Sequence, residues 1–310
     1  MSGRLPTASL LKKMSSRTTS KRTWVRLTCQ RRMSEMSDFS SQTISHIDRE
    51  FIAELLGKGE RLDGRAFDQY RDIQVEANVV PAKAEGSALV RLGDTSVVAG
   101  VKVLVGEPYS DAPDEGVIMV TAEMSPIASP LFELGPPKED AIELARIVDR
   151  GVRESEMVDA KKLCILEGKK VYMVFADVYP LEYDGNLIDA SSIAVNVALL
   201  TTKFPEMKVE EKELVATGKI LSLPVANIAV EHTIVKIGKH LILDPTLKEE
   251  FVQDCRLTMA IDEKNNFTAL QKGGGTGAMS LSLIEQAMDM ALVAGKDIRR
   301  KIDESVKAVK

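Results

Sequence analysis

Residues 135–150 read Gly-Pro-Pro-Lys-Glu-Asp-Ala-Ile-Glu-Leu-Ala-Arg-Ile-Val-Asp-Arg, and this stretch decides how the fold is assigned. The glycine and the two prolines end any preceding regular structure. The acids Glu139 and Asp140 suit the first turn of a helix, because the helix dipole is positive there. We therefore predict a helix over about 138–156. Its core-facing stripe should consist of apolar residues at helical spacing, namely Leu144, Ala145, Val148 and Val152.

The same helix should present three arginines on a side separate from this stripe, at positions i, i+4 and i+7: Arg146, Arg150 and Arg153. Like charges at this spacing cost about 0.2–0.5 kcal/mol on an isolated helix. On spacing alone, we favour a solvated face relieved by the neighbouring acids Glu143, Asp149 and Glu154. The functional alternative is contact with the phosphate backbone of a nucleic acid.

Strands precede this helix, and a second helix rich in small residues follows it at about 188–202. The strands expected in the first half are 70–80, 86–92, 96–105, 117–124 and 171–178. A shorter second half repeats the order, with strands at 227–237, 240–243, 255–262 and 266–271 and a last helix at about 280–304. Because each half gives strands and then a helix, the sequence predicts an α+β protein of two related domains.

Charge is unevenly distributed along the chain. Residues 1–34 carry nine Lys and Arg and no acid. Because the net charge of the whole chain is −5, residues 35–310 carry a net charge of −14. We expect 1–44 to be a disordered basic extension outside the fold, resembling either a transit peptide or translated upstream sequence before a true start at Met33 or Met36. An acidic body does not hold nucleic acid by bulk charge, so any binding must come from a few placed basic residues or from a partner.

Several other kinds of site are not supported. The three cysteines are widely spaced and the three histidines lack metal-ligand spacing, so we expect no disulfide framework, no metal and no cofactor. We expect Cys164 to be a buried strand thiol in an intracellular, reducing compartment, which makes a cytoplasmic protein the expectation. No run of eighteen apolar residues occurs, so no membrane span is expected.

The glycine run Gly273–Gly277 is the most conspicuous local signal. It satisfies G-x-G-x-x-A with Ala278, but only one helix follows it, and a dinucleotide site needs a second strand and a later acid. What remains is a loop before a helix, which is either an anion site or a surface turn.

Further motifs complete a pattern: Arg61-Leu62-Asp63-Gly64-Arg65, Gly86-Ser87-Ala88 with Gly93-Asp94-Thr95, Asp184-Gly185-Asn186 with Asp189-Ala190, and Gly275-Thr276-Gly277-Ala278-Met279-Ser280. Together with 135–150, these motifs resemble RNase-PH-type proteins. The resemblance is specifically to the non-catalytic, 42-type subunit of the archaeal RNA exosome, and it spans about 45–305.

The resemblance implies a ribosomal protein S5 domain 2-like core over 45–205, a connection over 206–221 and an RNase PH C-terminal-type domain over 222–305. It implies a hexameric ring of three heterodimers with a catalytic RNase-PH-like sister subunit, and a cap of RNA-binding subunits. Such a ring degrades single-stranded RNA from the 3′ end with inorganic phosphate as the attacking group.

Departures from the catalytic members suggest that this chain has no catalytic residue. Asn186-Leu187-Ile188 stands where catalytic members carry the phosphate-binding Gly-Thr-Arg, and Ser222 aligns with the general acid. Arg146 and Arg150 match arginines that line the RNA path in the resembled subunit, and Arg153 is a third candidate. Two alternatives remain: an active phosphate-dependent exoribonuclease that forms a homohexamer, and a purely structural ring subunit of a eukaryotic exosome.

Overall fold

The computed structural model describes residues 46–210 and 213–309. The chain divides into two units, Met1–Asp48 and Arg49–Lys310, and the fold described below is that of the second. Helix α2 (His46–Gly57) starts at the edge of the described residues. The basic extension expected over 1–44 lies outside them.

The first sheet has the order β1-β2-β3-β6-β4, with the short β5 pairing with β6. Its strands are β1 (Ile73–Ala77), β2 (Gly86–Leu92), β3 (Thr95–Gly106), β4 (Val117–Ala122), β5 (Cys164–Leu166) and β6 (Lys170–Glu182). Only β4 runs parallel to its neighbour β6. Parallel neighbours need a crossover connection, and helix α3 (Glu139–Glu154), followed by the 3-10 turn Ala160–Leu163, supplies it.

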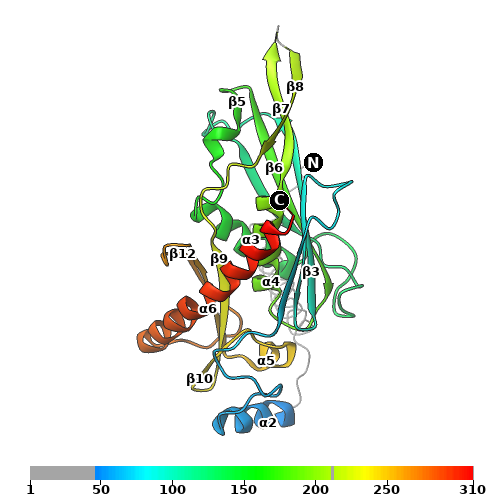
Figure 1. Cartoon of the computed structure of the whole chain (residues 1–310). Helices are drawn as coiled ribbons and strands as arrows, with labels where there is room; N and C mark the ends of the chain where they lie inside the picture. The colour runs from blue at the N-terminus through cyan, green and yellow to red at the C-terminus, as the bar shows by residue number, and fades with distance from the viewer. Residues whose placement is uncertain (1–45, 211–212, 310) are drawn as a thin grey trace, which may run out of the picture. The chain divides into compact units, whose positions relative to one another are not determined.

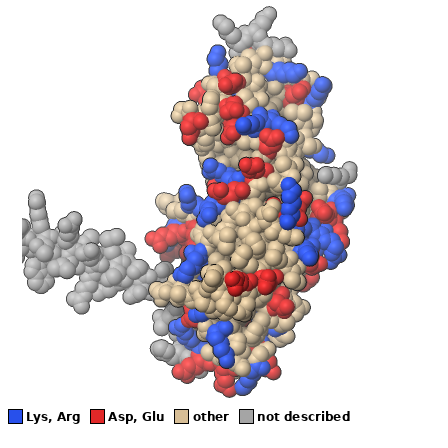
Figure 2. Space-filling model, turned by 90° about the vertical axis from the view of Figure 1, so that its left-hand side faces the viewer, with Lys and Arg blue, Asp and Glu red and all other residues tan. Residues whose placement is uncertain are grey.

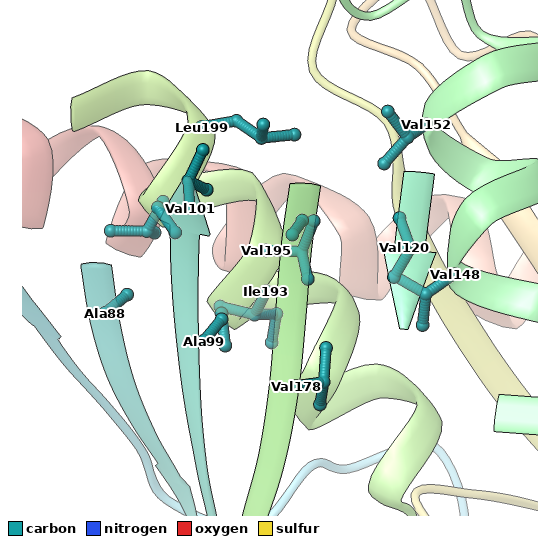
Figure 3. Packing of buried hydrophobic residues seen from close by; sticks show 14 of the residues in the cluster. Ala88, Ala99, Val101, Val120, Val148, Val152, Val178, Ile193, Val195 and Leu199 are labelled. Carbon is teal, nitrogen blue, oxygen red and sulfur yellow. The ribbon is translucent and has the colours of Figure 1, made fainter. Parts of the chain in front are cut away.

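Helix α4 (Leu187–Thr201) is buried along nearly its whole length, because its small and apolar side chains have no polar face to give to solvent. It packs on β2 and β3 of the first sheet and on β9 of the second. Figure 3 shows the close packing of Ala88, Ala99 and Val101 with Ile193 and Leu199. A Cβ on Gly86 would lie 2.2 Å from the carbonyl oxygen of Ala198, so only glycine lets β2 approach this helix so closely.

The second sheet has the order β10-β9-β11-β12 and is antiparallel throughout. It contains β9 (Val230–Ile237), β10 (His240–Leu243), β11 (Cys255–Ile261) and β12 (Phe267–Gly273), with the short helix α5 (Leu247–Val252) between β10 and β11. The last helix, α6 (Leu281–Lys307), crosses the body of the protein (Figure 1). Its N-terminal half packs in the second core cluster through Ala287 and Ala291, and its C-terminal half packs in the first through Ile298, Ile302 and Val306.

The structure differs from the sequence-based expectation in three places. The segment expected as a plain connection contains a β-hairpin, β7 (Lys203–Glu210) and β8 (Glu213–Ser222), whose second strand is almost entirely exposed. Helix α5 was not expected, because six residues are too few for a periodic signal. Cys164 lies in β5 but is half-buried rather than buried, since this strand lies at the margin of the sheet.

No helix in the described part of the chain is long and apolar enough to cross a membrane. Figure 2 shows Lys and Arg scattered among Asp and Glu over the face that it presents, with no large patch of one sign. On this face, the charges form no basic patch of the kind that attracts nucleic acid by bulk charge.

Candidate nucleic-acid interface

Helix α3 lies between the first sheet and the edge strand β12 of the second. Its predicted apolar stripe is confirmed: Leu144, Val148 and Val152 are buried and Ala145 packs against the same core. The opposite side of the helix therefore remains available for polar contacts. The three candidate arginines lie on that side.

The three arginines have different surroundings. Arg146 is exposed and makes no hydrogen bond or ion pair with any residue that the structure describes. Arg150 is half-buried, and its Nη1 donates to Oε1 of Gln271 on β12 at 3.1 Å. Arg153 is exposed, and its Nη1 lies 3.5 Å from Oδ2 of Asp149. Within the described residues, Arg146 is thus the cation of the group without a partner, and Arg150 is the anchored one.

The acids of α3 relieve this charge less than the sequence suggests. Glu143 turns to the second sheet, where its Oε1 lies 2.7 Å from Nη2 of Arg256 on β11. Of the three acids expected to pair with these arginines, only Asp149 does so within the described residues. The expectation of a face neutralised by Glu143, Asp149 and Glu154 is therefore wrong in the main.

A buried polar network surrounds the turn that precedes α4. Asp244 is fully buried, and its carboxylate accepts hydrogen bonds from Arg65 Nη1 at 2.9 Å, Arg71 Nη2 at 2.8 Å and Asn186 Nδ2 at 2.8 Å. Asn186 adopts a left-handed conformation with φ of 54°, which brings its side chain back over the helix start. The network thus joins the segment before β1, the first domain and the strand end at Asp244.

Asp189 extends this network into the core. Its Oδ2 accepts hydrogen bonds from Tyr70 Oη at 2.6 Å, Asn186 Nδ2 at 2.9 Å and the backbone of Thr233 at 3.0 Å. Burial raises the pKa of Asp189 to about 6, although these hydrogen bonds oppose the shift. Tyr70 Oη also lies 3.0 Å from Nδ1 of His232, and burial together with the charge of Arg299 lowers the pKa of His232 to about 3.

Two further carboxylates close the network. Arg61, one of the residues singled out in the sequence, is buried and donates to both oxygens of Glu249, with its Nη2 at 2.6 Å from Oε2. Glu250 accepts from the Tyr183 hydroxyl at 2.7 Å and from the backbone of Asn186 at 2.8 Å. Asp244, Glu249 and Glu250 thus accept hydrogen bonds on both carboxylate oxygens. Asp189 accepts them on Oδ2, and its buried Oδ1 has no partner among the described residues.

The structure corrects the expected position of Ser222. This residue pairs with Lys203 at the base of the β7–β8 hairpin, just after the C-terminal end of α4. The segment Asn186–Ile188 lies at the opposite end of that helix, so Ser222 is not beside it. The residues of the second domain that do meet Asn186 are Asp244 and Glu250.

The glycine run is explained by packing rather than by anion binding. A Cβ on Gly275 would lie 2.1 Å from the carbonyl oxygen of Asp254, and one on Gly277 would lie 2.7 Å from the same atom. Gly274 and Gly275 also have positive φ. The loop therefore packs directly on the backbone before β11, and the surface-turn interpretation is the better one. No group of three His, Cys, Asp or Glu with metal-binding geometry occurs within 46–210 and 213–309.

Fold and site together define an α+β protein of two sheet domains that share one polar network. The family model described as the 3′ exoribonuclease family, domain 1, matches residues 69–205, and the domain 2 model of that family matches residues 227–294. The chain therefore belongs to the 3′ exoribonuclease (RNase PH) family, as its motifs indicate.

Within this family, the chain is similar to exosome components called Rrp42. The exosome complex component Rrp42 of Thermococcus kodakarensis is 47% identical over 276 residues, covering 88% of this chain and 99% of the relative. A solved structure described as the Archaeoglobus fulgidus exosome with RNA bound to the active site contains a chain with 46% identity and a TM-score of 0.76. That match covers 82% of this chain and 97% of the other. An archaeal exosome core gives 43% identity and a TM-score of 0.73, covering 83% and 96%.

Proposed function

We propose that this chain is a ring subunit of an RNA exosome that binds single-stranded RNA and supports a catalytic sister subunit without performing catalysis itself. The observation that carries the proposal is the pairing of Arg146 and Arg150 on one side of α3, the first without a protein partner in the described residues and the second anchored on β12. Guanidinium groups in this state suit charge-assisted contacts to phosphate oxygens. Arg153 is the weaker candidate, because Asp149 lies beside it.

The absence of catalysis is proposed from the turn at the start of α4. Leu187 and Ile188 occupy positions where a phosphate-binding member needs a cation, and neither offers a hydrogen bond from its side chain. Around them, Asp189 and Asp244 are fully buried, and the half-buried Glu250 accepts hydrogen bonds from protein donors on both carboxylate oxygens. A carboxyl group that is fully buried, or whose oxygens are both held by protein donors, is not placed to protonate a leaving oxygen.

The partners and the location are those that the family resemblance implies, and they are proposals here. A catalytic RNase-PH-like subunit would alternate with this chain in a hexameric ring of three heterodimers, with RNA-binding cap subunits on one face, in the cytoplasm. The complex would degrade RNA from the 3′ end by phosphorolysis. The domain limits 45–205 and 222–305 belong to the same proposal.

The test is RNA binding by the reconstituted ring over a series of salt concentrations, comparing the parent with the double variant Arg146→Ala, Arg150→Ala. Each phosphate contact on a single strand contributes roughly −0.7 to the slope of log K against log salt, so losing two should flatten the slope by about 1.4. RNA decay should slow in parallel, and the loss should be similar for all RNA sequences.

The matched control is Arg91→Ala, Arg300→Ala, which removes two exposed arginines elsewhere on the protein. Its slope should equal that of the parent. An unchanged slope and unchanged decay in the α3 double variant would refute RNA contact and leave a structural role. Release of nucleoside diphosphates from RNA and phosphate by the purified chain alone would refute the absence of catalysis and favour the homohexameric exoribonuclease.

A further inference from the structure

Glu143 lies one helical turn from Arg146 but forms no ion pair with it in the described structure. It precedes Arg146 by three residues on α3, a spacing at which an acid and a base normally meet on a helix surface. Instead, its carboxylate lies 2.7 Å from Nη2 of Arg256, which comes from β11 of the second sheet. The Arg256 side chain is largely buried, whereas Glu143 is about half exposed. The carboxylate of Glu143 is therefore held by Arg256 of the second domain, away from the side of α3 that carries Arg146 and Arg150 (the arginine face).

We infer that Arg256 is a positioning residue that holds Glu143 away from Arg146, so that the arginine face of α3 keeps its charge for RNA. This inference rests on the proposed function. A Glu143 released from Arg256 would be free to pair with Arg146, or to stand beside the incoming phosphates and repel them. Either outcome would weaken RNA binding although no residue in contact with RNA had changed.

The surroundings of the ion pair are shaped to admit it. Gly273 on β12 lies opposite Arg256 in the register of the sheet. A Cβ on Gly273 would lie 2.8 Å from Nη2 of Arg256 and 3.0 Å from Oε1 of Glu143, closer than normal van der Waals contact. The φ of Gly273 lies outside the left-handed region, so its backbone conformation does not require glycine. Space for the ion pair is what a side chain at this position would remove.

The same face of the sheet also fixes the second arginine. Gln271 lies two residues before Gly273, so both point to one side of β12, and Gln271 accepts the hydrogen bond from Arg150. Arg256 and Gln271 of the second sheet therefore fix the positions of two charged side chains of α3. The acid is bound to β11, Arg150 is anchored on β12, and Arg146 has no partner in the part of the chain that the structure describes.

The inference is tested by a double-mutant cycle in the reconstituted ring, with Arg256→Gln, Glu143→Gln and the two combined. Measured at low salt, Arg256→Gln should weaken RNA binding by about two- to fivefold. This is the range expected for the exposed ion pair that a released Glu143 would form with Arg146. In the Glu143→Gln background the same change should have little effect, because no acid remains to be released. The difference should shrink at high salt.

Equal losses in both backgrounds would overturn the inference, because they would mean that Arg256 acts on RNA or on the fold directly. No loss in either background would overturn it as well. Gly273→Ala, which crowds the ion pair and leaves every charge in place, goes through the same cycle in case Arg256→Gln folds poorly. It should also weaken binding only while Glu143 is present. The Arg146→Ala, Arg150→Ala variant, measured alongside, separates the two claims: if it binds RNA normally, the proposed function itself fails.

Discussion

Nη2 of Arg71 lies 2.8 Å from Oδ1 of Asp244, although 173 residues of sequence separate the two. The pair is buried and is supported by Arg65 and by Asn186, so one carboxylate ties together the segment before β1, the start of α4 and the end of β10. Removing one member of such a cluster leaves buried charges without a partner, which costs far more than the loss of a surface ion pair.

We therefore expect Asp244→Asn to lower the free energy of unfolding by about 3–5 kcal/mol. The control is Asp297→Asn, which breaks an exposed ion pair with Arg300 and should cost less than about 1 kcal/mol. Urea unfolding of both variants gives the comparison. Similar small losses for the two would show that Asp244 does not hold the domains together.

His232 should make the protein sensitive to acid. Its pKa falls to about 3 in the folded state from 6.5, so between these values the unfolded chain binds a proton that the folded chain does not. Stability contributed by neutral His232 is present above pH 6.5 and is lost as the pH falls, by up to about 1.4 kcal/mol per pH unit. His232→Gln should show a correspondingly flatter fall in the free energy of unfolding between pH 6.5 and 5.

The raised pKa of Asp189 gives a slope of opposite sign over about pH 4–6, because there the folded state keeps a proton that the unfolded state loses. Asp189 is present in both proteins, so subtracting one curve from the other isolates His232. Parallel curves for parent and His232→Gln would contradict the prediction. His240→Gln is the comparison: partial burial and the charge of Lys239 also lower the pKa of this half-buried histidine, so its replacement should flatten the fall less than His232→Gln does.

Comparing Gly275→Ala with Gly238→Ala separates the cost of steric crowding from the cost of a positive φ. Both have positive φ, but a Cβ on Gly275 would lie 2.1 Å from the carbonyl oxygen of Asp254, whereas one on Gly238 would meet no atom of the described residues within 4 Å. Gly238→Ala should cost about 1–2 kcal/mol from conformation alone. Gly275→Ala should cost about 1–3 kcal/mol more, because backbone must shift to admit the methyl group. Equal losses in thermal or urea unfolding would indicate that the loop before α6 is not packed as described.

Ile302 and Val293 lie on the same helix, and only the first contributes to the core. Ile302 is fully buried in the first core cluster, and Val293 is 74% exposed. Ile302→Ala should lower the free energy of unfolding by about 2–5 kcal/mol, and Val293→Ala should change it by no more than about 0.5 kcal/mol. A small effect at Ile302 would mean that the end of α6 is not part of the core of the first domain.

Helical periodicity predicts α3 and α6 to within a few residues, because their apolar stripes face a core on one side only. It does not predict the β7–β8 hairpin, since β8 is exposed on both faces and so shows no alternation. The arginines of α3 were predictable from spacing. The contacts of Arg150 with Gln271 and of Glu143 with Arg256 could not be predicted, because each joins residues more than one hundred positions apart. Ser222 was misplaced because linear order does not show at which end of α4 a later segment returns.

The last turns of α6 have a consequence for how the protein is made. Ile298, Ile302 and Val306 fill the core of a sheet whose first strands end by Ala122. A nascent chain therefore carries these strands with an incomplete core until the final helix has emerged from the ribosome. During that interval the apolar face of the sheet is open to wrong contacts. A stalled or prematurely terminated chain would remain in that vulnerable state.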